Sequence, residues 1–97
     1  MYTYKGKYNF KKDVITNWDS SDTGVYYLWQ ESKVVYVGSA VSEDGIRGRL
    51  LQHINDNKFP YNVKEFGYKV INGKNAVLAH ELSEIKRLQP RYNIVGK

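Results

Sequence analysis

The stretch GVYYLWQESKVVYVG, residues 24–38, contains two runs of apolar and aromatic residues separated by the polar tripeptide Gln30-Glu31-Ser32. Valine, tyrosine and tryptophan favour strands, whereas the polar tripeptide is typical of a turn. The stretch therefore predicts an antiparallel hairpin with strands at residues 24–29 and 33–38 and a loop of about three residues. A glycine at each outer end, Gly24 and Gly38, permits close approach of a second backbone or of a substrate.

Two helices are predicted after the hairpin. The first covers residues 45–55 and follows the candidate cap residues Ser42 and Asp44. The second covers residues 76–88, with Asn75 as its cap and a proline two residues beyond its end.

The remaining segments complete the expected order of elements. Residues 65–71 alternate as a third strand does, and residues 11–18 predict a short helix. Residues 1–10 predict either a short strand or a loose arm, and residues 91–97 predict an extended tail. The order predicts a small α/β (α+β) domain with a three-stranded antiparallel sheet flanked by helices.

Composition and charge narrow the class of protein. A chain of 97 residues is the size of one small domain, and the absence of cysteine excludes disulfides and thiolate metal sites. A net charge of +5 and a pI near 9.4 favour a polyanionic partner. No apolar run is long enough to cross a bilayer, and no charged-then-apolar leader begins the chain. We therefore expect a cytoplasmic protein with no membrane partner.

The helix predicted at residues 76–88 carries an apolar stripe at helical spacing, formed by Val77, Leu78, Leu82, Ile85 and Leu88. Glu81 projects near the middle of this stripe, where an ionised carboxylate needs a compensating cation or hydrogen bonds. Three arrangements satisfy it: a divalent metal, a salt bridge to lysine or arginine, or a place at the rim of a shorter stripe. Glu84 lies at the edge of the stripe, where we expect it to be solvated or paired with a lysine.

The helix predicted at residues 45–55 places Arg49 and His53 on one flank, four residues apart. An arginine can grip a phosphate with two hydrogen bonds, and a histidine can orient or deprotonate a water at neutral pH. For the pair alone, a surface arginine and a half-buried histidine bonded to backbone is the better interpretation. Arg47 is a rival phosphate ligand on another side of the helix.

Taken in order along the chain, these features resemble the GIY-YIG nuclease family. Gly24-Val25-Tyr26 and Tyr36-Val37-Gly38 match its two tyrosine motifs, with valine in place of isoleucine. Arg49 matches the family arginine, and His53 matches the His or Tyr that follows four residues later. Glu81 matches the family glutamate.

The C-terminal part of the chain extends this resemblance. Lys86-Arg87-Leu88-Gln89-Pro90-Arg91-Tyr92-Asn93 resembles the end of the nuclease domain of the excision-repair protein UvrC. The likeness covers roughly residues 22–95, which it implies are the catalytic core of a single domain spanning residues 1–97. Residues 1–21 would then be an N-terminal extension.

The resemblance implies a metal-dependent endonuclease that hydrolyses DNA phosphodiester bonds and leaves 5′-phosphate and 3′-hydroxyl ends. Glu81 would bind Mg²⁺ or Mn²⁺, and Arg49 would hold the phosphate and neutralise its developing charge. Tyr26, Tyr36 or His53 would activate the water.

Each of the other matched residues also has a structural interpretation. The resemblance implies that the amide of Asn93 helps to hold the site together, whereas by itself it reads as a turn residue or a strand-end cap. Strand tyrosines such as Tyr26 and Tyr36 are usually cross-strand packing residues.

One departure from the family concerns the contacts to phosphate. The second tyrosine motif is often followed by lysine, but here Gly38 is followed by Ser39. The phosphate contacts expected at this end of the hairpin are Gly38 and Ser39, and the missing lysine's role falls to Lys33, to Arg47 or to nothing.

The partner expected from this reading is DNA, single- or double-stranded. A chain of 97 residues has no room for the separate DNA-binding domain of most family members. We therefore expect a small stand-alone nuclease, a catalytic domain excised from a longer protein, or a nuclease that relies on a specificity partner or a homodimer. The lysine-rich N-terminus holds aromatic residues that can stack on unpaired bases and favour a single-stranded substrate: Tyr2, Tyr4, Tyr8 and Trp18. The competing function is a non-catalytic nucleic-acid-binding module with a degenerate GIY-YIG fold.

Overall fold

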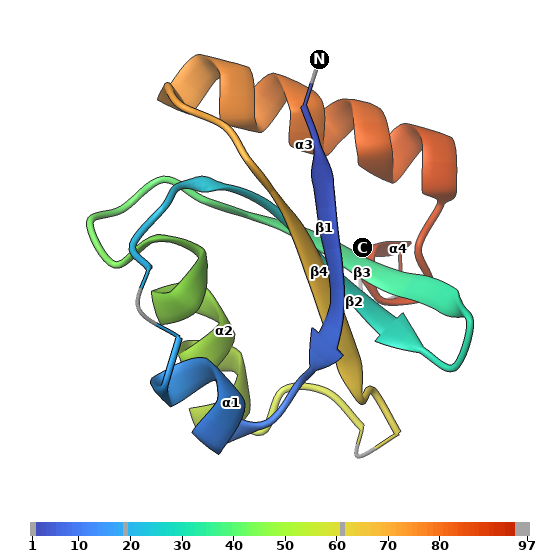
Figure 1. Ribbon diagram of the computed structural model, residues 1–97. Coiled ribbons are helices and arrows are strands. Elements are labelled where there is room, and N and C mark those ends of the chain that lie inside the picture. The colour runs from blue at the N-terminus through green and yellow to red at the C-terminus, as the bar shows by residue number, and fades with distance from the viewer. Residues whose placement is uncertain (1, 19, 61, 95–97) are drawn as a thin grey trace.

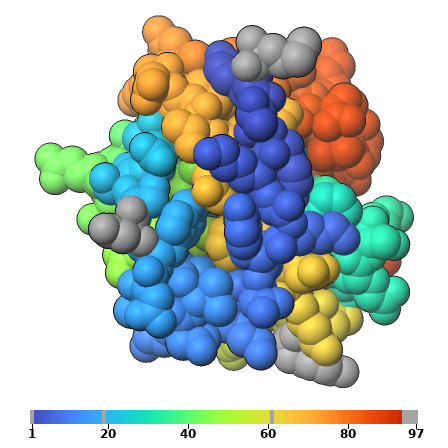
Figure 2. Space-filling view, in the orientation of Figure 1, coloured from blue at the N-terminus to red at the C-terminus, as the bar shows by residue number. Residues whose placement is uncertain are grey.

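A four-stranded antiparallel sheet forms the centre of the computed structural model, which describes residues 2–18, 20–60 and 62–94 (Figure 1). The strands are β1 (Tyr4–Asn9), β2 (Gly24–Gln30), β3 (Lys33–Ala40) and β4 (Glu65–Val70). Their spatial order is β1-β4-β2-β3, so β1 and β3 are the two edges. The predicted α/β class with an antiparallel sheet is confirmed, but the number of strands is wrong. The fourth strand is β1, whose residues are all exposed and lie along one face of the molecule in Figure 2.

Four helices complete the described part of the chain: α1 (Lys12–Thr16), α2 (Gly45–Asn55), α3 (Lys74–Leu88) and α4 (Arg91–Ile94). The bounds predicted for α2 are confirmed, and Asp44 holds its cap position without a capping bond from its side chain. The cap predicted for α3 is wrong, because the helix begins one residue before Asn75 and is preceded by Gly73 at φ 97°. The prediction of an extended tail is also wrong for residues 91–94, and residues 95–97 lie outside the described residues.

The helices cover both faces of the sheet, with α1 and α2 on one side and α3 on the other (Figure 1). Central strand β2 is buried on both faces and supplies alternate residues to two apolar clusters. Tyr26 and Leu28 pack with α1 and α2, whereas Val25 and Tyr27 pack with α3. Successive residues of β2 therefore pack against helices on opposite faces of the sheet. Within the described ranges, no helix is long and apolar enough to span a membrane.

The buried face of α3 differs from the predicted stripe. Leu78 is 40% exposed and Leu82 is 69% exposed, while Glu84 is buried. The Glu84 carboxylate accepts hydrogen bonds from the Tyr27 hydroxyl (2.6 Å), the Lys69 ammonium (3.1 Å) and the Arg87 guanidinium (2.7 and 3.0 Å). The Arg87 bonds are the main cause of a Glu84 pKa far below its ordinary value, with support from Tyr27 and Lys69 against the opposing effect of burial. The prediction that Glu84 pairs with a lysine is confirmed, and the prediction that it is solvated is wrong.

We expect Glu84→Ala to lower the free energy of unfolding by about 3 kcal/mol, because it leaves a buried phenol and two cations without their shared acceptor. The loss lies at the lower end of the usual range for a broken buried pair, since the Arg87 side chain is 62% exposed and can turn to solvent. The depressed pKa means that this stabilisation is present above about pH 4.5 and is lost as the pH falls further.

Chemical denaturation of Glu84→Ala and of Glu81→Ala, from pH 7 to pH 3, measures these changes in the free energy of unfolding. Glu81→Ala is the matched control, because the Glu81 carboxylate makes no hydrogen bond or ion pair within residues 2–18, 20–60 and 62–94. Its effect should stay below about 0.5 kcal/mol. Equal losses in the two variants would contradict the assignment of Glu84 as the structural carboxylate.

Candidate active site

A buried hydrogen bond between strand β2 and helix α2 forms the core of the site. The Tyr26 hydroxyl lies 2.6 Å from His53 Nε2, and both side chains are buried. The Tyr26 ring leans across its strand partner Gly38, where a Cβ atom would clash with the phenol. A glycine at position 38 is therefore needed for Tyr26 to reach His53. This bond links residues 27 positions apart.

The environment of His53 keeps its imidazole neutral. Burial is the main cause of a His53 pKa lowered to about 4, and the charges of Lys58 and Arg49 add to it. Burial also raises the pKa of Tyr26, with contributions from Tyr36, and the nearby Arg49 opposes this shift without reversing it. At neutral pH the phenol therefore keeps its proton and the imidazole is neutral, so this hydrogen bond joins two uncharged groups, and the ring nitrogen that carries the His53 proton sets its direction.

Tyr36 joins this pair from strand β3. The β2–β3 pairing shifts register after Leu28, which faces Tyr36, so that Val35 is an extra residue in β3. Val35 and Tyr36 consequently pack against the same cluster as Tyr26. The Tyr36 ring centroid lies 5.7 Å from that of His53 and 6.2 Å from that of Tyr26. Unlike Tyr26, which is fully buried, Tyr36 is half-buried.

Two charged groups of opposite sign flank the tyrosines. Burial is the main cause of a raised pKa at both Tyr26 and Tyr36, and the charge of Arg49 on α2 opposes this rise. The Arg49 guanidinium donates to the Gln52 side chain at 2.6 Å. Glu81, half-buried on α3, raises the pKa of both phenols. The structure therefore brings together five residues that the sequence analysis singled out: Tyr26, Tyr36, Arg49, His53 and Glu81.

Glu81 is the candidate metal ligand of this group. Its carboxylate has no ion pair or hydrogen bond in the described part of the chain, although it is half-buried and its charge acts on the phenols of Tyr26 and Tyr36. Within the same described residues, no three His, Asp or Glu side chains lie close enough together to hold a metal ion. Mg²⁺ commonly binds through one or two carboxylates together with waters and substrate phosphates. Glu81 thus fits an ion whose coordination is completed by substrate and water.

Asn93 fixes the strand that carries Tyr36. Its side-chain oxygen accepts from the Val37 N–H and its amide nitrogen donates to the Val37 carbonyl, both at 2.8 Å. Because β3 is an edge strand, Asn93 takes the place of a neighbouring strand at this one residue. It therefore acts as a positioning residue for β3.

Two of the expected phosphate ligands lie elsewhere. Lys33 starts β3 at the hairpin turn, at the other end of the strand from Gly38. Arg47 donates to the carbonyls of Ile15 (3.1 Å) and Thr16 (2.9 Å) and so ties α2 to α1. Ser39 directly follows Gly38 in β3 and is half-buried.

Lys58 is a residue of this site that the sequence motifs did not identify. Its ammonium lies 5.3 Å from the centroid of the Tyr36 ring, and its charge lowers the pKa of His53. It follows α2 in a loop that also brings Phe59 to 4.9 Å from Tyr36. The available signal was a basic residue just beyond the Arg49/His53 helix, but no periodicity fixes where a loop side chain lies.

Comparisons of the chain with models of protein families, with curated protein sequences and with solved structures found no match.

We expect the His53 imidazole to titrate near pH 4 rather than near its ordinary value of 6.5. The unfolded chain takes up this proton first, so the free energy of unfolding falls as the pH drops from 6.5 to 4. Histidine ring resonances followed by NMR give the midpoint, and His80→Gln identifies the signal, since the chain has two histidines.

Lys58→Ala should raise the His53 midpoint because it removes a repelling charge, whereas Lys64→Ala, which alters another exposed lysine, should leave it unchanged. A midpoint near 6.5 in the unmodified protein would contradict the buried, cation-flanked environment described for His53.

We expect Asn93→Ala to lower the free energy of unfolding by about 2 kcal/mol, because it removes two hydrogen bonds of about 1 kcal/mol each. The Val37 amide should then exchange its hydrogen faster, which NMR can follow at a single residue. Asn72→Ala, at an exposed asparagine, is the control and should change stability by less than about 0.5 kcal/mol. Unchanged exchange at Val37 would show that Asn93 does not hold the edge of β3.

Proposed function

We propose that this chain is a metal-dependent endonuclease of the GIY-YIG type that hydrolyses phosphodiester bonds of DNA. The observation that carries the proposal is the buried Tyr26–His53 hydrogen bond of 2.6 Å, flanked by Arg49 and Glu81. A phenol bonded to a neutral imidazole can move a proton, and a cation and a carboxylate beside it can hold a phosphate and a divalent ion. The order of these residues along the chain resembles that of the nuclease family.

Arg49 and Lys58 hold the scissile phosphate in this proposal. The guanidinium offers a planar pair of donors to two phosphate oxygens, and Lys58 adds a point charge over the Tyr36 ring. Lys58 supplies the cation that follows the second tyrosine motif in many family members, because the chain has Ser39 at that place.

The attacking water gives up its proton along a relay that ends at His53. Tyr26 is fully buried, so the half-exposed Tyr36 is the phenol that meets the water. The water proton passes to the Tyr36 oxygen, the Tyr36 proton to Tyr26, and the Tyr26 proton to His53 Nε2. The water oxygen bonds to phosphorus as the bond to O3′ breaks, and O3′ takes a proton from solvent. The products carry 5′-phosphate and 3′-hydroxyl ends.

Substrate binding prepares His53 for this step. The charges of Lys58 and Arg49 help to hold its pKa near 4 in the free protein, which makes the imidazole a weak base. A bound phosphate neutralises both cations and favours the imidazolium, so the His53 pKa rises when substrate is present. The base is therefore strongest when it is needed.

Glu81 would hold Mg²⁺ or Mn²⁺ against the phosphate. When bound, such an ion acts as a Lewis acid that stabilises negative charge on the phosphate and on the leaving oxygen. The carboxylate itself needs no rearrangement for this role, because no ion pair or hydrogen bond with another residue of the described ranges engages it.

Cleavage of labelled single- and double-stranded DNA with Mg²⁺, Mn²⁺ or EDTA tests the proposal. We expect metal-dependent cutting that Glu81→Ala and Arg49→Ala each reduce by about 10² to 10³, the usual loss when one electrostatic stabiliser is removed. Glu43→Ala, at an exposed glutamate before α2, is the matched control and should cut normally.

Two results would overturn the proposal. Salt-sensitive DNA binding without cutting would favour the non-catalytic nucleic-acid-binding module. Cutting that survives Glu81→Ala would place the chemistry at another site or in a contaminant.

A further inference from the structure

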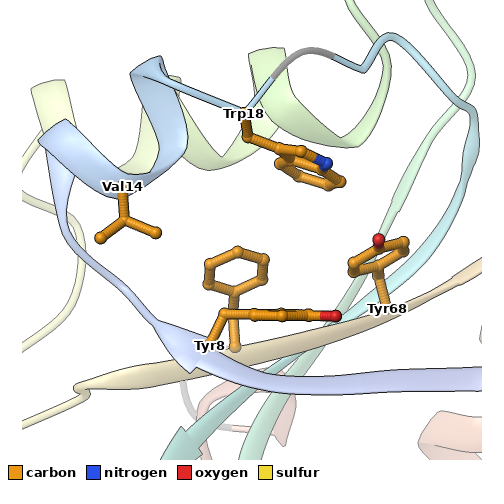
Figure 3. Close-up of a pocket in the computed structure, with 5 residues that line it drawn as sticks. Tyr8, Val14, Trp18 and Tyr68 are labelled. Atoms are coloured by element: carbon orange, nitrogen blue, oxygen red, sulfur yellow. The ribbon is translucent and has the colours of Figure 1, made fainter.

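A second concave site lies beside β1, at the edge of the sheet opposite to β3. A cavity of about 240 Å³ is lined by Tyr8 of β1, Val14 of α1, Trp18, and Phe66 and Tyr68 of β4 (Figure 3). None of these residues belongs to the candidate active site. Tyr8 is 44% exposed and forms one wall, whereas Phe66 and Tyr68 are buried beneath it.

The walls of this cavity are aromatic and its polar atoms gather at one end. Figure 3 shows the Trp18 ring facing the Tyr8 ring across the cavity, with Tyr68 at the end away from Val14. The Tyr8 and Tyr68 hydroxyls and the Trp18 indole nitrogen lie toward that same end. Such an arrangement suits a flat ring with apolar faces and polar edge atoms.

A change of face in β1 creates the cavity. The pairing of β1 with β4 shifts register between Lys5 and Tyr8. Tyr4 packs against Tyr27 on the α3 face, at a centroid distance of 5.3 Å. Tyr8 instead packs against Phe66 (5.6 Å) on the α1/α2 face. In an unbroken strand, residues four apart would share a face, so the irregularity turns Tyr8 toward Trp18.

A lysine flanks the cavity. Lys5 pairs directly with Tyr68, and since its neighbour Tyr4 is on the α3 face, the Lys5 side chain shares the face of Tyr68. Lys5 is exposed, and the chain carries a net charge of +5. The Lys5 ammonium is thus a cation that an anionic group attached to a flat ring in the cavity would meet.

We propose that this cavity binds one unpaired base of single-stranded DNA, with Lys5 at the adjoining phosphate. An apolar cavity of about 150 Å³ is enough to hold benzene, so 240 Å³ holds a ring with its substituents. Stacking on aromatic side chains accepts any base, whereas a paired base in a duplex does not offer its faces. The inference rests on the proposed function for the identity of the polymer, and it names the single strand as the substrate class.

The two sites lie at opposite edges of the sheet. Strands β1 and β3 are separated by three inter-strand spacings, which is roughly 14 Å at about 4.8 Å each. A base held beside β1 therefore belongs to a nucleotide several positions from the phosphate cut beside β3. The cavity acts as an anchor for the strand and takes no part in the chemistry.

Binding measured in EDTA tests the anchor separately from cleavage. The protein carrying Trp29→Phe leaves Trp18 as its single tryptophan, so fluorescence quenching reports on this cavity. We expect saturable quenching by a single-stranded thymidine oligonucleotide, and little by its duplex, by an abasic oligonucleotide of equal length or by free thymidine. Tyr8→Leu should raise the oligonucleotide Kd about tenfold or more, the size expected for one lost stacked base.

Leu78→Ala is the matched control. It removes an apolar side chain of similar exposure, 40% against 44% for Tyr8, from α3 on the other face of the sheet. Its Kd should be unchanged, and thermal unfolding of both variants confirms that they fold.

Equal quenching by the abasic oligonucleotide, or an unchanged Kd in Tyr8→Leu, would overturn the proposal. Free thymidine binding as tightly as the oligonucleotide would overturn the assignment to a nucleic-acid strand. Loss of binding in Tyr8→Leu, without any DNA cleavage by the unmodified protein, would refute the proposed nuclease function and support the proposed base-binding cavity. Cleavage of duplex DNA that Tyr8→Leu does not change would support the nuclease function and refute the base-binding cavity.

Discussion

The two consecutive tyrosines of β2 must each bury a phenol on opposite faces of the same strand, and the rest of the structure depends on how this is satisfied. A buried hydroxyl is costly without a partner. Tyr26 finds His53 of α2 and Tyr27 finds Glu84 of α3, each at 2.6 Å. Each covering layer is thus tied to the central strand by a polar contact at a fixed place within an apolar cluster. That pair of bonds fixes one residue of each helix relative to the central strand, and the apolar clusters around them hold the rest.

On each face of the sheet, the partner of the buried tyrosine has two cations near it, but the cations act in opposite ways on the charge of that partner. Lys58 and Arg49 lie near His53 and disfavour its charged form, so burial and charge act together to keep the imidazole neutral. Lys69 and Arg87 contact Glu84 and favour its charged form, so charge overcomes burial. A neutral base bonded to a phenol can exchange a proton, whereas a carboxylate saturated by donors cannot. One face is accordingly suited to chemistry and the other to stability.

How far the sequence predicts this arrangement depends on the range of the interaction. The hairpin and α2 follow from strand propensity, a polar turn and an i,i+4 spacing, which are local, and both were predicted at nearly their true bounds. The face of α3 was misjudged because Leu78 and Leu82 continue an apolar period that the sheet does not cover. A helical period fixes which residues share a side, but only the long-range bonds of Glu84 fix which side turns inward.

The candidate site was predictable as a set of residues but not as a set of contacts. The motif residues identified Tyr26 and His53 separately, yet nothing in their spacing predicts a bond across 27 positions. Lys58 lies in a loop, and β1 is an exposed edge strand whose alternation carries little apolar signal. The Tyr26–His53 bond, the position of Lys58 and the pairing of β1 all depend on contacts between segments that are far apart in the sequence.

The location of the candidate site on an edge strand sets a further requirement that Asn93 meets. An edge strand offers unpaired N–H and C=O groups that would bind another strand or fray. Beside Tyr36, the Asn93 amide satisfies both groups of Val37, with bonds of 2.8 Å. Two hydrogen bonds from a single side chain therefore hold β3 at its outer edge, next to the residue that carries the half-buried Tyr36 ring.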